Sequence, residues 1–254
     1  MADALVYVYA VGESALADVE ELGALAGVDG AAVRVVGSGA LAAAVSSVDP
    51  TRFSEESLRK SLEDLHWLER IARAHHGVVD ELRRRQPVVP VRLATIYVDD
   101  DNVRALLDAN ADRFAAALDL TRGRTEWGVK AFAAAGASEE PDPEVDAGGP
   151  GTAYLMRKRA ARDRAARARQ RLLDAAEEVH ARVGAIAVAT RRYRPQDPRL
   201  SGRDEEMVLN AAYLVDDARS AELRRLVEGW DAPELQLELT GPWAPYSFAE
   251  LEQR

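Results

Sequence analysis

Four histidines are the side chains of this sequence best suited to bind a metal ion or to transfer a proton. They are His66, His75, His76 and His180. No two of them have the H-x-x-x-H spacing that places both imidazoles on one face of a helix. His75 falls within a helical repeat of apolar residues, where a hydrogen-bonded core histidine is commoner than a catalytic base. We therefore predict no metal site and no catalytic base at these positions.

A run of three carboxylates, Asp99-Asp100-Asp101, is the second group of residues that could bind a cation. It lacks the glycine and the distal glutamate of an EF-hand calcium loop. The run comes directly before a helical pattern, and acidic residues are favoured at the N-terminal end of a helix. We therefore predict that these residues, with Asn102, cap a helix.

The sequence lacks the motifs of common cofactor sites and nucleophilic enzymes. Gly37 and Gly39 do not continue into G-x-G-x-x-G, and neither G-x-x-x-x-G-K-[ST] nor G-x-S-x-G occurs. There is no cysteine, which excludes disulfides, thiolate zinc sites and cysteine nucleophiles and is typical of a reducing cytosol. We predict no catalytic residue, no cofactor and no enzymatic activity.

The strongest concentration of charge is an arginine-rich stretch, 157–171, with seven arginines and one lysine against one aspartate. The stretch lies in a predicted helix, and its basic residues flank a narrow apolar stripe on both sides instead of forming one basic face. The stripe consists of Tyr154, Ala161, Ala165, Ala168, Leu172, Val179 and Val183. The formal net charge of -10 also argues against nucleic acid as a partner. Two alternatives remain for this helix, an acidic partner surface and a solvated face.

The composition is typical of a folded protein with two domains. Of 254 residues, 47% are hydrophobic and 30% are charged, which supplies a core, and the length favours two domains of ordinary size. Asp3 stands where a signal peptide would carry basic residues, and no run approaches the ~18 apolar residues of a membrane span. We therefore expect a cytoplasmic protein without a membrane partner.

Residues 1–122 are predicted to form an α+β domain with long helices. The expected elements are strand 5–10, helix 14–26, strands 32–36 and 41–48 joined as a hairpin, a helix from Ser54 to the residues before Pro87, strand 88–97 and helix 101–120. The long helix is predicted from residues at steps of three and four that form one buried stripe, all of them apolar except His75. These are Leu58, Leu62, Leu65, Leu68, Ile71, His75, Val79 and Leu82.

Residues 123–240 are predicted to form a second domain. The expected elements are strand 125–133, helix 152–182, strands 185–193 and 206–215, helix 218–229 and strand 235–239. This β-α-β-β-α-β order is the ferredoxin-like pattern. The first domain has a similar order with an added helix, so two related sandwiches are an alternative. The acidic stretch 138–150 is interpreted as a loop inside the second domain and not as a linker between domains.

Residues 241–254 form a tail with three aromatic residues, Trp243, Tyr246 and Phe248, among prolines that are expected to prevent a helix or a strand ladder. Aromatic rings of this size lose much favourable transfer free energy if they stay in water. We therefore expect the tail to pack, either over its own N-terminal domain or, as the alternative, against a partner protein.

Several motifs resemble those of the gas vesicle protein F/L family (GvpL/GvpF). The tail Leu239–Phe248 matches the family's L-T-G-P-W-P-P-Y-S-F except for Ala244. Glu126–Lys130 matches E-W-G-V-K, and Val208–Tyr213 matches V-L-N-A-A-[FY]. The remaining matches are Tyr154-Leu155 with Lys158, His75 with Val78-Val79, and Val89–Arg92. Leu93–Ile96 departs from the family's F-G-T-V.

The resemblance implies a non-enzymatic role in building gas vesicles. Its implied partners are the small hydrophobic shell protein and other gas vesicle accessory proteins, met during nucleation or early growth. It also implies a ferredoxin-like C-terminal domain, a tail turned towards the N-terminal domain, and a cytoplasmic location associated with the vesicle. The alternative function is a small-molecule-binding regulatory protein, since paired ferredoxin-like units often bind metabolites.

Overall fold

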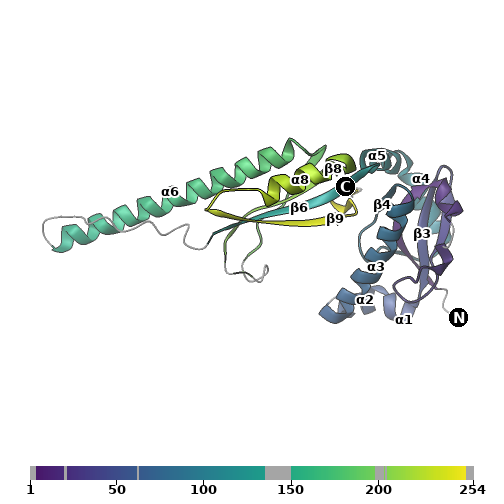
Figure 1. The fold of residues 1–254 in the computed structure, drawn as a ribbon. Coiled ribbons are helices and arrows are strands. Elements are labelled where there is room, and N and C mark those ends of the chain that lie inside the picture. Colours follow the sequence, from purple (N-terminus) through teal and green to yellow (C-terminus); the bar gives the residue numbers. More distant parts are fainter. Residues whose placement is uncertain are drawn as a thin grey trace. The chain divides into compact units, whose positions relative to one another are not determined.

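Two antiparallel sheets, each covered by helices, form the framework of the protein (Figure 1). The computed structural model describes residues 4–19, 22–61, 63–134, 150–197, 203 and 205–249. These residues form two compact units, which we describe separately: unit 1 contains Met1–Glu126 with Pro242–Arg254, and unit 2 contains Trp127–Gly241. The fold is therefore of the predicted α+β class. The predicted loop 138–149 and the end of the tail lie outside the described residues.

Unit 1 is built on a five-stranded sheet. Its strands are β1 (Leu5–Glu13), β2 (Arg34–Ser38), β3 (Leu41–Val48), β4 (Val88–Pro90) and β5 (Ile96–Tyr97). Its helices are η1 (Ser14–Asp18), η2 (Leu22–Ala24), α1 (Pro50–Phe53), α2 (Glu55–Ser61), α3 (Leu65–Arg85), α4 (Asp100–Ala109), α5 (Ala111–Thr121) and η4 (Tyr246–Phe248). The strand order is β2-β3-β1-β4, and β5 also pairs with β1.

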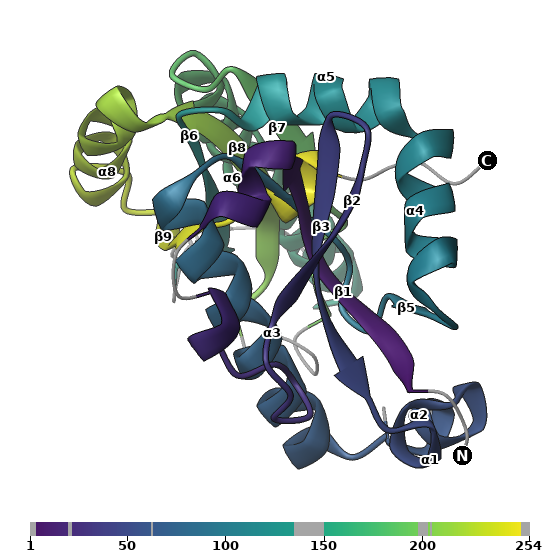
Figure 2. The same cartoon turned by 90° about the vertical axis from the view of Figure 1, so that its right-hand side faces the viewer.

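Strand β1 is buried on both faces, because helices cover both sides of the sheet. Tyr7 and Tyr9 point into a cluster with α3, whereas Val6 and Val8 point into a second cluster with α4 and α5. Figure 2 shows α3 and α4 on opposite sides of β1 and β3. The register with β3 shifts between Val8 and Ala10, so a bulge lies at Tyr9.

The predicted hairpin of unit 1 is confirmed. β2 and β3 pair from Arg34↔Val45 to Ser38↔Leu41, and Gly39 has φ +58, which suits the glycine of a tight turn. The position of Pro90 agrees with the expectation of an edge, since β4 ends the sheet order.

The predicted long helix from Ser54 is wrong as one element, because it divides into α2 and α3. Asp64 begins the second helix: its side chain accepts hydrogen bonds from the backbone N–H groups of His66 and Trp67. Leu65, expected on the buried stripe, is 77% exposed. Further along α3 the stripe is buried as predicted at Ile71, His75, Val79 and Leu82. Leu62 lies outside the described residues.

Three other predicted elements of unit 1 are also interrupted. Helix 14–26 is replaced by the short 3-10 turns η1 and η2, and strand 88–97 by β4 and β5, between which Ala94 has φ 61. Helix 101–120 divides at Asn110 into α4 and α5. Propensity and periodicity are averaged over a window, so they do not detect a turn of one or two residues.

Unit 2 is built on a four-stranded sheet with helices on one face. Its elements are β6 (Arg124–Ala133), α6 (Pro150–Gly184), β7 (Ala189–Arg192), β8 (Met207–Asp216), η3 (Asp217–Arg219), α8 (Ser220–Glu228) and β9 (Leu235–Trp243), with β6 and β9 crossing the unit boundaries. The strand order is β7-β8-β6-β9. In chain order this is the same arrangement as β2-β3-β1-β4 of unit 1. The core joins Val129 of β6, Tyr213 of β8, Val179 of α6 and Leu223 of α8.

Strand β9 continues to Trp243, so the expectation that the tail prolines prevent a strand ladder is wrong at Pro242. β9 is an edge strand of its sheet. An edge strand has backbone N–H groups that do not pair, so proline is tolerated there. No helix in the described part of the chain combines the length and the apolarity needed to span a membrane.

Candidate functional site

The C-terminal segment Pro242–Ala249 packs into unit 1. Ala244 is fully buried in the cluster that contains Tyr7 and Tyr9 of β1 and the buried apolar residues of α3, such as Val78. Ala249 is buried in the second cluster of the same unit, beside residues of α4 and α5. We call Pro242–Ala249 with the residues that it contacts in unit 1 the docking site of the tail.

The three aromatic residues that the sequence singles out occupy different environments in this site. Tyr246 is half-buried, and its ring lies 6.1 Å from the ring of His75 and 6.2 Å from that of His76. Burial, followed by the nearby charge of Asp80, raises the pKa of Tyr246. Trp243 lies 5.3 Å from the ring of His76 and remains 42% exposed. Phe248 is half-buried at the end of η4.

His75 is a structural histidine at the centre of the docking site. Its Nδ1 lies 3.0 Å from the hydroxyl of Tyr7, which accepts a hydrogen bond of 3.0 Å from the backbone N–H of Ala94. Because the Tyr7 oxygen accepts from Ala94, its own proton is available for Nδ1, and this arrangement requires a neutral imidazole. Burial lowers the pKa of His75 from 6.5 to about 4, against an opposing interaction with the backbone of Val91.

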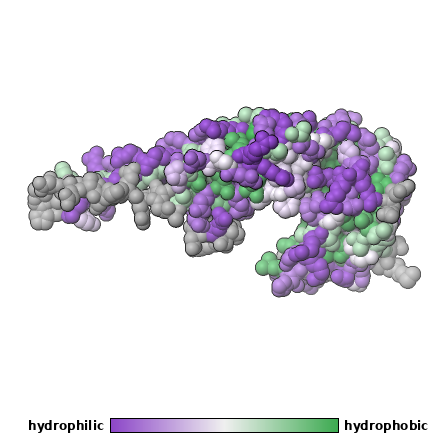
Figure 3. Space-filling view, in the orientation of Figure 1, coloured by the Kyte–Doolittle hydropathy of each residue, from purple (hydrophilic) through white to green (hydrophobic). Residues whose placement is uncertain are grey.

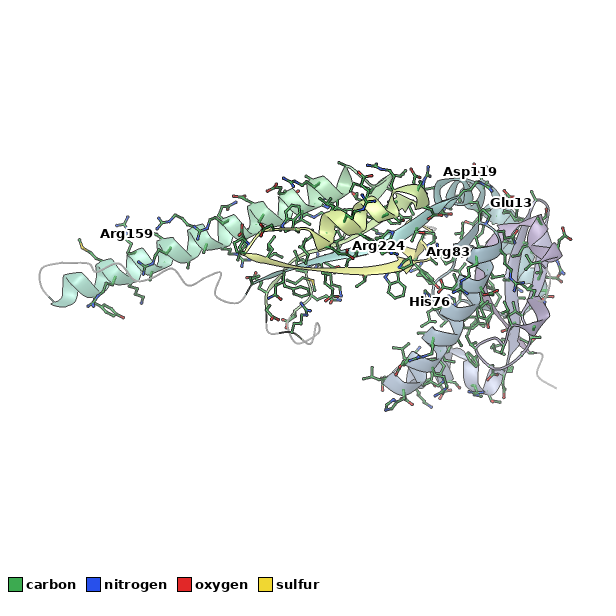
Figure 4. The ribbon with its side chains drawn as sticks, viewed as in Figure 1. Glu13, His76, Arg83, Asp119, Arg159 and Arg224 are labelled. Atoms are coloured by element: carbon green, nitrogen blue, oxygen red, sulfur yellow. The ribbon has the colours of Figure 1, made fainter. Side chains whose placement is uncertain are left out.

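Glu126 ties the tail to the start of β6. Its carboxylate is buried and accepts hydrogen bonds from the backbone N–H and the hydroxyl of Ser247. The neighbouring Thr125 accepts a hydrogen bond of 3.1 Å from Arg83 of α3. Figure 4 shows Arg83 and His76 on α3. Sequence reasoning did not assign Glu126 or Arg83 to a site, although Glu126, a charged residue inside a predicted strand, was a usable signal.

Three of the motifs that carry the family resemblance, those of the tail, Glu126 and His75, meet at this site. Ser247 of the tail bonds to Glu126 of the E-W-G-V-K strand. In unit 2, a Cβ added to Gly128 of that strand would lie 2.4 Å from Oγ1 of Thr240, so only glycine fits opposite this threonine. His75 of a third motif lies against Tyr246.

The other residues singled out for possible chemistry have structural surroundings. Asp99 is the N-cap of α4 and accepts from the backbone N–H of Asn102, which confirms the predicted capping role. Asp100 forms a two-bond ion pair with Arg34. The Nδ1 atom of His180 lies 2.7 Å from the hydroxyl of Tyr213. His66 is exposed at the start of α3.

The docking site is therefore suited to holding a segment of chain and to presenting an aromatic surface. His76 Nε2 lies 3.3 Å from Asp80 Oδ2, so this histidine too is engaged within α3. Among the described residues, no group of three or more His, Cys, Asp or Glu side chains is placed to hold a metal ion.

A profile of the family described as "Gas vesicle synthesis protein GvpL/GvpF" matches residues 5–250 of the chain. The chain is 43% identical to gas vesicle protein L of Streptomyces sp. (strain CB03234) over 230 residues, which cover 89% of this chain and 86% of the relative. It is 27% identical to gas vesicle protein F of the same organism over 256 residues, covering 96% and 99% of the two chains.

The fold is also similar to two crystal structures of gas vesicle protein GvpF. One is from Anabaena sp. PCC7120 and the other from Microcystis aeruginosa, each with a TM-score of 0.66 and 17% identity. The alignments cover 98% of this chain and 98% and 100% of those chains. The chain therefore has the α+β fold of these two structures, with its tail docked into unit 1. The chain belongs to the GvpL/GvpF family of gas vesicle synthesis proteins, as its motifs predict.

Proposed function

We propose that this protein is a non-catalytic assembly factor that binds the small hydrophobic gas vesicle shell protein and other accessory proteins during nucleation or early growth. In this proposal it acts in the cytoplasm in association with the vesicle. Family membership supports a role in gas vesicles. The observation that carries the binding role is the exposed side of the docked tail, where the aromatic side chain of Trp243 is 42% exposed.

Exposed apolar groups also lie along α3, beside the ion pair of Glu69 with Arg73. Leu65, Ala72 and His76 share one helix face, because their spacings of seven and four residues are close to whole numbers of turns. Leu65 and Trp243 are two of the exposed large hydrophobic residues of unit 1, and Trp243 contacts His76. We call Leu65, Ala72, His76 and Trp243 the α3 surface. Exposed apolar groups of this kind mark binding sites for apolar partners. If the α3 surface covers the apolar face of a hydrophobic subunit, that subunit no longer aggregates through this face.

The contacts of three histidines support a non-catalytic role. His75 and His180 are each bonded to a tyrosine hydroxyl, and His76 lies against Asp80. Enzyme sites instead need a nucleophile and a base that point together at a substrate.

We also propose the domain organisation that the sequence predicts. It consists of an N-terminal α+β domain, 1–122, a ferredoxin-like C-terminal domain, 123–240, and a tail, 241–254, which is the docking or partner-binding element. The order β6-α6-β7-β8-α8-β9, with strands arranged β7-β8-β6-β9, supports the ferredoxin-like assignment. The hydrogen bonds between Ser247 and Glu126 support the docking role of the tail.

Co-purification tests the proposed function. The tagged chain and the untagged shell protein are expressed together in a host without other vesicle genes, and shell protein in stoichiometric amount is expected in the eluate. Trp243→Ala is expected to reduce recovery, whereas Val188→Ala, which truncates a similarly exposed residue of unit 2, serves as the matched control. Absence of shell protein from the wild-type eluate counts against direct binding.

Two further measurements separate the alternatives. Light scattering of shell protein is expected to fall when the chain is added, and an unchanged signal contradicts the shielding role. A rise in the melting temperature of the chain with metabolites, without any shell binding, would instead favour the small-molecule regulator.

A further inference from the structure

Helix α6 is longer than the sheet that it covers. Its 35 residues span about 52 Å at 1.5 Å per residue. Strand β8, with 10 residues, spans about 33 Å. About a third of the helix therefore has no strand of its own sheet beneath it, and α6 continues past the end of the sheet (Figure 1).

Among the side chains of α6 that the structure describes, burial begins at Ala168. From there the helix contributes Ala168, Leu172, Ala176, Val179 and Val183 as buried residues. The N-terminal part of the apolar stripe is not covered, because Tyr154 is 59% exposed and Ala161 and Ala165 are exposed as well. We call residues 154–167 the free half of α6, because no strand of its own sheet lies beneath it; Arg157 and Arg164 within it have contacts of their own.

The free half continues the core-facing stripe without covering it. Tyr154, Ala161 and Ala165 lie in line with Leu172, since their spacings follow the helical repeat. Lys158 and Arg162 flank the stripe on one side. Arg157 and Arg164 flank the stripe on the other side, and Arg159 and Arg167 lie on the opposite face of the helix. The visible surface of α6 is accordingly largely hydrophilic (Figure 3), and Arg159 is labelled beyond the sheet in Figure 4.

The charge of the free half is opposite to that of the chain. It holds six basic side chains and one acidic side chain, Asp163, whereas the whole chain has a formal net charge of -10. A positive surface of this kind attracts negatively charged partners.

We infer that the free half of α6 binds an acidic amphipathic helix of another protein. The inference rests on the proposed function in taking that protein to be a member of the same assembly. Alanines at Ala161 and Ala165 allow a second helix to approach closely, as small residues do at helix interfaces. Large apolar residues of the partner pack against this stripe, and its acidic residues pair with the exposed side chains of Lys158 and Arg162, as at the e and g positions of a coiled coil.

The geometry argues against the two other occupants of a basic helix. A nucleic acid backbone calls for a basic face, whereas here an apolar stripe lies between the basic flanks. A second copy of the free half would bring like charges together. The free half is also continuous with a packed helix, so little conformational entropy is lost when a partner binds.

The probe for this inference is a synthetic peptide of about three heptads with leucine at a and d and glutamate at e and g. A peptide of the same composition in scrambled order is its control. Binding of each labelled peptide to the full chain is measured by fluorescence anisotropy. The amphipathic peptide is expected to bind about tenfold more tightly than the scrambled one.

Two double variants with equal charge change test the face of the helix. Lys158→Glu/Arg162→Glu reverses one flank and is expected to weaken binding about tenfold, whereas Arg159→Glu/Arg167→Glu reverses the opposite face and is expected to weaken it less than about threefold. A third variant, Ala161→Lys/Ala165→Lys, adds positive charge but blocks close approach, so weaker binding is expected. All substituted side chains are exposed, and circular dichroism checks that the helix is retained.

Several outcomes overturn the inference. For the wild-type chain, they are no binding of the amphipathic peptide, equally tight binding of the scrambled peptide, or tighter binding of a homopolymeric RNA than of the amphipathic peptide. For the variants, they are equal losses of peptide affinity in Lys158→Glu/Arg162→Glu and Arg159→Glu/Arg167→Glu, or tighter peptide binding in Ala161→Lys/Ala165→Lys. Sedimentation that shows wild-type dimers lost in Lys158→Glu/Arg162→Glu would assign the surface to a second copy. Binding seen only after neutralising Glu139, Glu140, Asp142, Glu144 and Asp146 would assign it to the chain's own acidic segment.

The same variants are tested for co-purification with shell protein, which separates this inference from the proposed function. Loss of peptide binding with retained shell protein supports the free half as a distinct surface. Peptide binding by a wild-type chain that recovers no shell protein supports the helix surface while counting against the shell-binding role.

Discussion

Ser247 donates two hydrogen bonds, one from its backbone N–H and one from its hydroxyl, to the buried carboxylate of Glu126. The two residues are 121 positions apart in the sequence. A buried carboxylate is costly unless donors surround it, so this pair stabilises the docked tail only while both partners are present. The tail is thus held by a specific polar contact as well as by its apolar residues.

Removing the charge of Glu126 is expected to loosen the tail. In Glu126→Gln the amide can accept one of the two bonds but turns an N–H group towards the other donor, so the free energy of unfolding should fall by about 1–3 kcal/mol. Ser247→Ala keeps the backbone bond and should cost about 0.5–1.5 kcal/mol. Urea unfolding measures both. If the double variant shows simply additive losses, the two side chains are not coupled and the contact contributes nothing specific.

The stability of unit 1 is expected to depend on pH through His75. Its pKa of about 4 lies below the unfolded value of 6.5, so the unfolded chain binds more protons between these pH values. The titratable groups in ring contact with it are Tyr7, Tyr9 and Tyr246, and the adjacent His76 also acts on it electrostatically. The contribution of neutral His75 is complete above pH 6.5 and is lost as the pH falls to 4, by about 3 kcal/mol.

Urea unfolding at several pH values between 7 and 4 checks this dependence. His75→Gln removes the titrating group, so its stability should change less steeply with pH over this interval than that of the wild type. His66→Gln changes an exposed histidine and is the control. Equal slopes for the wild type and His75→Gln would contradict a depressed pKa at His75.

The sequence predicts the class of fold and most of the core, but it does not predict where helices break. Apolar residues at steps of three and four run from Leu58 to Leu82 and favour one helix. The break depends on Asp64, whose side chain caps α3 by a local hydrogen bond that periodicity does not detect. The alternation of small and large apolar residues at the start of β1, by contrast, needs only the pleat of a strand, and this strand was predicted.

The docking site was predictable only in part, because its contacts join distant segments. Aromatic content indicates that the tail must pack, but the fully buried residue of the segment is Ala244, whose small side chain gives no signal of burial. The exposure of the free half of α6 was not predictable either, because it too depends on a distant segment. Its stripe matches that of the packed half, and only the length of the sheet decides which part is covered.

A methyl group at Gly27 is expected to disrupt a buried hydrogen-bond network. The hydroxyl of Tyr9 bonds to Ser46 at 2.7 Å and accepts from the backbone N–H of Val28. A Cβ at Gly27 would lie 2.5 Å from the oxygens of both side chains. Gly27→Ala should therefore lower the free energy of unfolding by about 1–3 kcal/mol.

Gly23→Ala is the matched control for this substitution. Gly23 is exposed, and an added Cβ would have no heavy atom within 4 Å, so stability should stay within about 0.5 kcal/mol of the wild type. Thermal unfolding compares the two variants. Equal melting temperatures would mean that the pocket around Tyr9 can expand to admit the methyl group.

The boundary between the packed and the free half of α6 can be tested by placing the same charge on each side of it. Ala168 is 3% exposed, whereas Ala161, seven residues earlier on the same face, is exposed. Ala168→Glu buries a carboxylate without a partner and should lower the free energy of unfolding by about 3 kcal/mol or more. Ala161→Glu should change it by less than about 0.5 kcal/mol, because its carboxylate stays in water and gains basic neighbours. Urea unfolding followed by circular dichroism measures both variants, and a large loss in Ala161→Glu would show that the helix packs along its whole length.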